Sequence, residues 1–487
     1  MKYPMNQYIA RVKWLIDNCN FAVMNQEYYD EAGMFVENSH YLGGQLDSGF
    51  YRVNTVNGVR EFHYKEVVDF LEHYRMTPSK TYDFDSAIKL NDGKKIVVGF
   101  SIHPRIDNVI TYRKNFFDKL FSDTYFLQLL ISGKVHMYLY YGYEADNFND
   151  NSSINNDFEK MLDDTIKDYN LPYNSVFVLS SNLMGYQNFK KVMDFDKHEN
   201  VNNPRIIYDN FYEVNTFKSL KGDIDLDYAF DEYIDNCKKT DKYCLRLNRT
   251  AHSSRDLMLY YLEKSRNIDK SIIEHSTYNS TQVDEIFNKI EKQSHINVYL
   301  NKYREITPYL KSDEYTHLSI NNKLPLIASP SEINGIFSQH YSNETIPHDV
   351  YKNSIFSWVS TTFADKYNQV FLNMSTFNPI LYYHPLIFIG NNNTVTYLRK
   401  CGYLSYEFLH DEDLIDYSGD YSERCLLSMI EVDKLFNISK DNLIGLISEN
   451  RDVLEYNKKK LIECDSIRRI LDGVYNILNN NNIGHYF

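Results

Sequence analysis

The sequence predicts an α/β protein with two Rossmann-like domains. Strand-like and helix-like segments alternate in two runs, one over about 96–208 and the other over about 243–402, and the polar interval 221–240 lies between them. Strands that alternate with helices pair in parallel through crossover connections, so each run predicts a parallel sheet of its own. The length of 487 residues also exceeds that of one ordinary core and suits two or three domains.

The first run contains four short apolar segments typical of buried strands, and segments with helical spacing lie between them. The predicted strands are 95–101, 134–140, 175–180 and 204–208, and the predicted helices are 116–130 and 158–169. Residues 1–95 contain two helix-like patterns that the sequence does not place in a fold. We therefore expect an N-terminal extension over 1–95 and a first Rossmann-like domain over 96–238.

The second run predicts a further domain of the same class. It opens with the strand 243–248, and strand and helix units follow up to about residue 402. A helix over 254–264 and a charged helical stretch near 282–293 lie between these parts. We expect this domain to span 239–440 and amphipathic helices to fill the C-terminal segment 441–487.

Composition and charge exclude several classes of protein. The net charge of −14 argues against a general polyanion-binding surface, although a local basic cleft can exist in an acidic chain. The six cysteines form no Cys-x-x-Cys pair and have no histidine at metal-ligand spacing, which favours a reducing compartment. No stretch approaches the roughly eighteen apolar residues of a spanning helix. We expect no membrane span and a cytoplasmic location.

One polar motif follows the first strand of the second run. Leu245-Arg-Leu-Asn-Arg249 ends that strand, and Arg255 follows where the next helix begins. Guanidinium forks and the backbone N–H groups of a helix N-terminus both favour phosphate oxygens. We hypothesise that Asn248, Arg249 and Arg255 bind a diphosphate. Ordinary arginines at a solvated helix start are the alternative.

A second polar motif, within 371–379, precedes another apolar strand. Ser375 and Thr376 are residue types that cap helices, and Pro379 is expected in the first helical turn, which tolerates proline. The backbone N–H groups of such a turn face any anion placed there. Asn373, Ser375 and Thr376 are therefore predicted to form a second part of the anion site.

These motifs resemble the C-terminal signature of viral and phage glycosyltransferases that are distantly related to α-1,3-fucosyltransferases. In that family a Leu-Asn-Arg motif precedes a His-Arg pair, and a Phe-x-Thr-Glu-Lys-Thr-Phe-Lys-Pro-Ile block precedes a His-Pro-Phe-Ile strand. This chain keeps the arginines but has Ser254 at the His position. Met374 and Ser375 replace the Glu-Lys pair, and Thr361 falls at a further acidic position of the family.

The resemblance implies a GT-B-like architecture, in which two Rossmann-like domains face a cleft, and a metal-independent hexosyl- or pentosyltransferase without a cofactor. The C-terminal half would bind the nucleotide-sugar donor through Asn248, Arg249, Arg255, Thr361, Asn373, Ser375 and Thr376. The N-terminal half would bind a glycan or modified-DNA acceptor, and a viral protein of this kind would act in the host cytoplasm. Glu144, in a Gly-x-Glu turn after the strand 134–140, is the expected general base, and a solvated loop acid is the alternative reading.

Other functions fit the same pattern. A DNA glycosyltransferase acting on hydroxymethylated pyrimidine bases would share the donor site but needs a basic, aromatic acceptor groove. A catalytically silent binding protein would keep the fold and lose the charged residues. Asp-x-Asp triplets would suit a metal-dependent enzyme, and they occur at 83–85, 194–196, 223–225 and 411–413. Such triplets are frequent by chance in an acidic chain and none follows a convincing buried strand, so we expect no metal site. The sequence assigns no oligomeric state.

Overall fold

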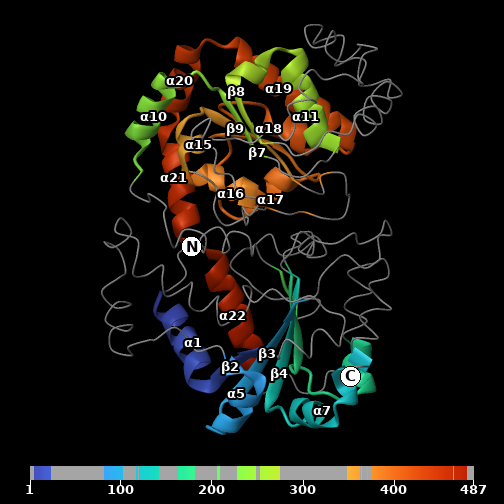
Figure 1. The fold of residues 1–487 in the computed structure, drawn as a ribbon. Helices are drawn as coiled ribbons and strands as arrows, with labels where there is room; N and C mark the ends of the chain where they lie inside the picture. The colour runs from blue at the N-terminus through green and yellow to red at the C-terminus, as the bar shows by residue number, and fades with distance from the viewer. Residues whose placement is uncertain are drawn as a thin grey trace, which may run out of the picture. The chain divides into compact units, whose positions relative to one another are not determined.

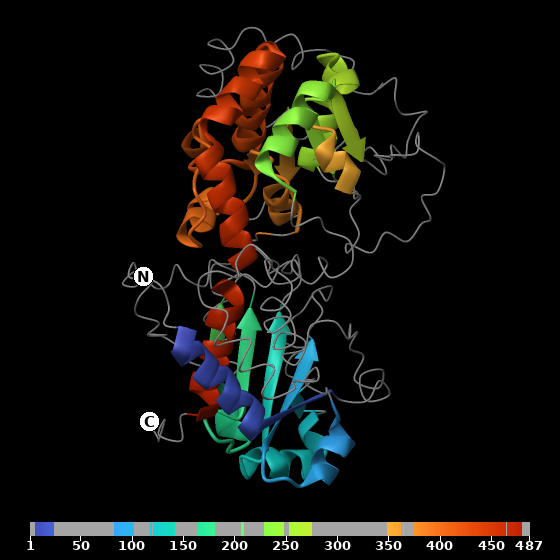
Figure 2. The same ribbon diagram turned by 90° about the vertical axis from the view of Figure 1, so that its left-hand side faces the viewer.

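Two parallel β-sheets organise the part of the chain that the computed structural model describes (Figures 1 and 2). The described residues are 5–23, 82–101, 117–118, 120–141, 163–180, 206–208, 228–247, 253–274, 348–361, 364, 370, 372, 374–463 and 465–479. The chain divides into a first unit, Met1–Val214 with Cys464–Phe487, and a second unit, Asn215–Glu463. The α/β class predicted from the sequence is confirmed.

The first unit contains a six-stranded sheet in the order β2-β1-β3-β4-β5-β6. Its strands are β1 (Cys19–Val23), β2 (Tyr82–Asp83), β3 (Lys95–Ser101), β4 (Val135–Tyr141), β5 (Val176–Ser180) and β6 (Ile206–Tyr208). Its helices are α1 (Met5–Asn18), α5 (Phe84–Leu90), α7 (Thr124–Ile131) and α22 (Asp465–Asn479). Every strand pair is parallel, as the alternation of strands and helices predicts.

The core of the first unit forms where alternate strand residues meet helices. Val98, Val135 and Val176 belong to a cluster that also includes residues of α5 and α7. Gly99 in β3 pairs with Tyr138 in β4, and a Cβ at Gly99 would lie 2.2 Å from the tyrosine ring. The register of these two central strands therefore requires glycine at this position.

The last helix of the chain, α22, belongs to the first unit. Lys95 Nζ and Asn174 Nδ2 donate to the carbonyl oxygens of Leu478 and Ile477 at 2.5 and 3.3 Å. These bonds satisfy acceptors that a helix end leaves unpaired, and the lysine also suits the negative end of the helix dipole. Gly473 lets the helix approach β6 closely, because a Cβ there would lie 2.8 Å from Ile207.

The second unit contains a four-stranded parallel sheet in the order β10-β9-β7-β8. Its strands are β7 (Cys244–Leu247), β8 (Ser271–Glu274), β9 (Phe356–Ser360) and β10 (Leu386–Ile389). Its helices are α10 (Phe230–Lys239), α11 (Ser253–Lys264), η3 (Asn267–Lys270), α15 (His348–Lys352), α16 (Met374–Leu381), α17 (Thr394–Lys400), α18 (Glu412–Asp416), α19 (Tyr421–Asn437), α20 (Lys440–Glu449) and α21 (Arg451–Glu463). All residues of β9 and β10 are buried, as expected for parallel strands covered on both faces.

The division into units differs from the boundaries expected from the sequence. Segment 1–95 supplies β1 and β2 to the first sheet, and segment 441–487 is shared between the units. The polar interval near residue 230 belongs to the second unit, because α10 buries Phe230 and Tyr233 and the Tyr233 hydroxyl donates to Ile355 O at 2.6 Å. Among the described helices, none combines the length and the apolar composition needed to cross a membrane.

Candidate functional site

The carboxyl edge of the second sheet is the best candidate for a ligand site. Among the described strands, the chain runs from β7 to β8 on one side and later returns to β9 on the other side of β7. This reversal is a topological switch point, and ligands of open α/β sheets bind beyond the carboxyl ends of the strands at such points. The residues that follow β7 and β9 are therefore placed to contact a ligand.

Two buried arginines meet at this switch point. Arg246 in β7 is 0 % exposed, and Arg255 in the first turn of α11 is 5 % exposed. Arg246 Nη2 donates to the backbone oxygen of Arg255. Arg255 Nη2 in turn donates at 3.2 Å to the backbone oxygen of Ser360, the last residue of β9. The two guanidinium groups thus join β7, α11 and β9 at their adjacent ends.

The electrostatics of this pair favour an anion. Burial lowers the pKa of Arg246 to about 9, the charge of Arg255 lowers it too, and the nearby Asp256 carboxylate acts in the opposite direction. Arg246 therefore stays protonated at neutral pH. The two guanidinium groups and the Asp256 carboxylate are thus buried together at this edge. Burial of a guanidinium charge is unfavourable, and an anionic ligand is one kind of group that reduces that penalty.

Hydroxyl groups gather at the same edge. Ser254 Oγ lies 2.6 Å from Ser360 Oγ, and Ser253 Oγ lies 3.0 Å from the Tyr421 hydroxyl. Thr361 is 2 % exposed, and its Oγ1 has no hydrogen-bond partner within the described residues. Buried hydroxyls almost always have a partner, so this atom is one that a ligand or an ordered water can satisfy.

The structure locates only some of the residues predicted from the sequence. Arg255 and Thr361 lie at the switch point, and Ser375 and Thr376 lie in the first turn of α16, which packs against β9 and β10. Thr376 is 0 % exposed, whereas Ser375 is partly exposed. The other predicted site residues fall outside the described residues: Glu144, Asn248, Arg249 and Asn373.

One local expectation for α16 is wrong. Pro379 is the sixth residue of α16 and lies in its second turn rather than its first. It therefore lacks the N–H that would normally bond to the carbonyl of Ser375. Packing decides the outcome, because Phe377, Ile380 and Leu381 are all nearly fully buried and hold the helix in place around the proline.

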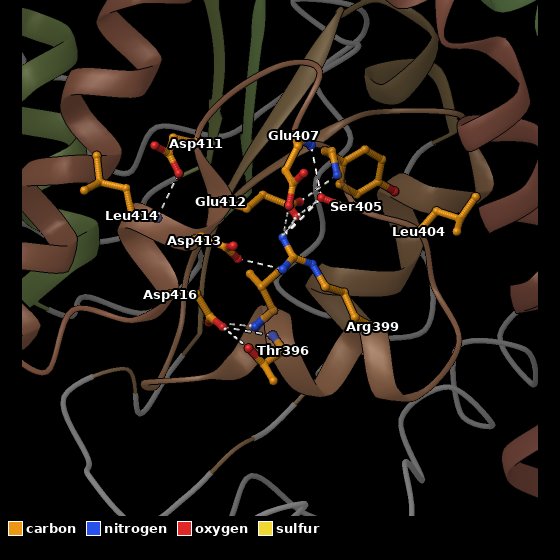
Figure 3. Close-up of polar contacts among 12 residues, drawn as sticks. Thr396, Arg399, Leu404, Ser405, Glu407, Asp411, Glu412, Asp413, Leu414 and Asp416 are labelled. Atoms are coloured by element: carbon orange, nitrogen blue, oxygen red, sulfur yellow. Dashed lines mark hydrogen bonds and ion pairs between the residues drawn. The ribbon is translucent and has the colours of Figure 1, made fainter. Parts of the chain in front are cut away.

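The N-terminus of α17 is already occupied by a carboxylate of the protein. Asp416 Oδ1 accepts from Val395 N at 2.8 Å, and Asp416 Oδ2 accepts from the backbone N and Oγ1 of Thr396 at 2.9 and 2.8 Å (Figure 3). Burial raises the pKa of Asp416, and these hydrogen bonds oppose that effect. The cap thus takes the donors that an anionic ligand would need at this helix start.

The carboxylates of the acidic triplet 411–413 also form hydrogen bonds and ion pairs within the protein. Asp411 Oδ1 accepts from Leu414 N at 3.0 Å, and Asp413 Oδ1 pairs with Arg399 Nη1 at 2.6 Å (Figure 3). The same arginine binds Glu412 at 2.8 Å. In the parts of the chain that the structure describes, no group of three or more His, Cys, Asp or Glu side chains could hold a metal ion.

His384 has a structural role. Its Nε2 donates to Tyr351 O at 2.7 Å, and its Nδ1 accepts from Ser357 Oγ at 2.9 Å. Burial lowers its pKa to about 4, so the ring is neutral at physiological pH. Both ring nitrogens serve to join α15, β9 and the start of β10.

Sequence reasoning missed Arg246 and a further buried arginine, Arg424. The available signal for Arg246 was a single charged side chain inside the apolar strand Cys244–Leu247. A charge in a strand that is otherwise buried is retained when it contacts other polar groups. Arg424 gave no comparable signal, because it lies in the long helix α19 among residues of every kind.

Comparison of the chain with protein-family models, with curated proteins and with solved structures found no match.

Proposed function

We propose that this protein is a metal-independent glycosyltransferase with a GT-B-like pair of domains, which moves a sugar from a nucleotide-sugar to an acceptor hydroxyl. The buried pair of Arg246 and Arg255 at the switch point of the second sheet is the observation that carries the proposal. The motif resemblance of the same region, with its Asn-Arg pair and Arg255, supports it.

The chemistry of glycosyl transfer suits this arrangement. The leaving nucleoside diphosphate gains negative charge in the transition state, and fixed positive groups stabilise that charge without a metal ion. The bond from Arg255 to Ser360 O orients its guanidinium plane before any ligand arrives. The Thr361 hydroxyl then offers a hydrogen bond to a sugar, ribose or phosphate oxygen.

The acceptor side of the proposal concerns the first unit. Glu144 follows the carboxyl end of β4, the edge at which ligands of parallel sheets bind. As general base it would take the proton from the acceptor hydroxyl while the bond to the donor sugar forms. Closure of the proposed inter-domain cleft would exclude the water that could hydrolyse the donor.

A thermal unfolding screen tests the donor site. UDP-, GDP-, CMP- and TDP-sugars are added separately, each in the presence of EDTA. We expect one nucleotide to raise Tm, since a ligand at 100 times its Kd stabilises the folded state by about 2.7 kcal/mol. An unchanged Tm with all four donors would reject the proposal, and a shift that needs added manganese or magnesium would indicate a metal-dependent enzyme.

A catalytically silent nucleotide-binding protein is the second candidate. Met374 and Ser375 favour it, because they replace the charged Glu-Lys pair of the family. Label transfer from the identified donor to glycans, to hydroxymethylated DNA and to unmodified DNA separates the possibilities. Transfer to glycans alone supports the principal proposal, and transfer to hydroxymethylated DNA supports the DNA-modifying variant. Firm binding without any transfer supports the silent protein.

A further inference from the structure

A third arginine, Arg424, holds the exits of two adjacent strands. It is the fourth residue of α19 and is 1 % exposed. Its Nε donates to Gly390 O at 3.1 Å, its Nη1 to Ser418 O at 2.8 Å and its Nη2 to Ala364 O at 2.7 Å. One planar group therefore binds three backbone oxygens from three separate segments.

The positions of these oxygens connect Arg424 to the candidate site. Gly390 directly follows β10, and Ala364 lies shortly after the end of β9. Thr361 lies between these contacts, because its N–H donates to Ile389 O at 3.0 Å and it directly follows β9. Arg424 thus fixes the backbone on either side of the buried Thr361 hydroxyl.

Close packing at Gly390 makes this strand exit rigid. A Cβ at Gly390 would lie 2.5 Å from the Phe388 ring and 2.6 Å from Thr394 Oγ1. The Thr394 hydroxyl itself donates to Asn391 O at 2.6 Å. The exit of β10 is consequently held by α17 and by Arg424, and it has little room to shift.

Arginine suits this position for two physical reasons. Its rigid fork directs several N–H groups outward in one plane, whereas lysine has a single rotating ammonium group. The three acceptors are neutral carbonyls, so these bonds leave the positive charge of the guanidinium in place at the carboxyl edge of the sheet. Substitution of Arg424 by lysine keeps the charge and removes the fork, and substitution by methionine removes both.

We propose that Arg424 is a positioning residue of the donor site: it fixes the exits of β9 and β10, and with them Thr361, and it adds positive charge that favours the diphosphate. This inference rests on the proposed function for its ligand. Its geometric part, that Arg424 sets the two strand exits, stands on the described contacts alone.

The test compares Arg424→Met and Arg424→Lys with a control, Arg399→Lys. Arg399 is an arginine of the same unit that binds carboxylates of α18 and its flanking loop rather than strand exits. Affinity is measured by calorimetry for inorganic pyrophosphate and for the nucleoside diphosphate identified by the thermal screen. We expect at least tenfold weaker binding with Arg424→Met, partial recovery with Arg424→Lys, and wild-type affinity with the control. Wild-type affinity in both Arg424 variants, or an equal loss in the control, would overturn the charge part.

Amide hydrogen exchange tests the geometry without a ligand. Peptides that contain Ser360 and Gly390 should exchange faster in both Arg424 variants and at the wild-type rate in the control. Gly390→Ala reaches the same exit without changing the arginine, and it should produce the same loss of protection if the Arg424 variants do not fold. Unchanged exchange in these peptides would overturn the positioning role. If the wild-type protein binds none of the probes, the proposed function fails, and exchange still decides what Arg424 does.

Discussion

Substitution of Arg255 separates the structural role of this arginine from its proposed role in binding. Arg255→Met keeps much of the buried volume and removes the guanidinium, and Arg255→Lys keeps the charge and removes the fork. Both substitutions change the hydrogen bond from Arg255 Nη2 to Ser360 O at 3.2 Å. Lys264→Ala, at the opposite end of the same helix, is the matched control.

The expected magnitudes follow from that contact. Loss of a hydrogen bond from a charged donor costs about 1.5–3 kcal/mol, and a buried carbonyl left without a partner costs about 1–3 kcal/mol. Both costs arise from the same broken hydrogen bond and are therefore not fully additive. We expect Arg255→Met to lower the unfolding free energy of the second unit by roughly 2–4 kcal/mol. If the same guanidinium binds a diphosphate, nucleotide affinity should also fall by roughly tenfold to a hundredfold.

Urea unfolding and calorimetric titration of each variant measure these two effects independently. Arg255→Lys should be closer to wild type in stability than in affinity. Lysine keeps the charge and much of the buried side-chain volume, but it lacks the fork of N–H donors that would bind a diphosphate. The control should change neither quantity. A variant that unfolds more easily yet binds nucleotide with wild-type affinity would show that Arg255 supports β9 and does not bind the donor.

Four further predictions concern other parts of the chain. Glu144→Gln should keep donor binding and lose roughly 10²–10⁴-fold in transfer rate, the usual contribution of a general base; wild-type turnover would make it a surface acid. Gly99→Ala should destabilise the first unit by about 1–3 kcal/mol in urea unfolding, because its Cβ would overlap Tyr138. Gly445→Ala, in an open position of α20, should instead stabilise by about 0.4–1 kcal/mol. His384 has a pKa lowered to about 4, so the stability that its neutral form supports is complete above its unfolded pKa of about 6.5 and is lost as pH falls toward 4, by about 3 kcal/mol in all. Unfolding at pH 7 and pH 4.5 measures this loss, and an equal loss in His384→Gln would assign it to other groups.

Long apolar segments were predictable from the sequence, and short or remote ones were not. The strand over 134–140 and the helix over 254–264 match β4 and α11 within one residue. Both were predictable because the apolar side chains of each segment indicate that it is buried. Strand β1 was missed because Cys19 follows α1 directly, without a turn residue between the two elements. Its pairing with β3 joins residues more than seventy positions apart, and the local pattern of apolar residues does not predict such a pairing.

The candidate site shows the same limit. Arg255 was predictable, since a helix N-terminus after a strand is a local feature with known chemistry. Arg424 was not, because its three partners are backbone oxygens and any sequence supplies those. The switch point itself follows from the order of strands in the sheet, and a single sequence does not specify that order.

The return of α22 to the first unit also has a consequence during translation. The ribosome releases the six strands of the first sheet early, but the helix that covers Lys95 and Ile207 is made only after the whole of Asn215–Glu463. At about 5–20 residues per second, that interval is on the order of tens of seconds. During this time the nascent first sheet exposes the apolar surface that α22 later covers, while the second unit can already fold. Nascent chains stalled before α22 should therefore recruit chaperones through the first unit.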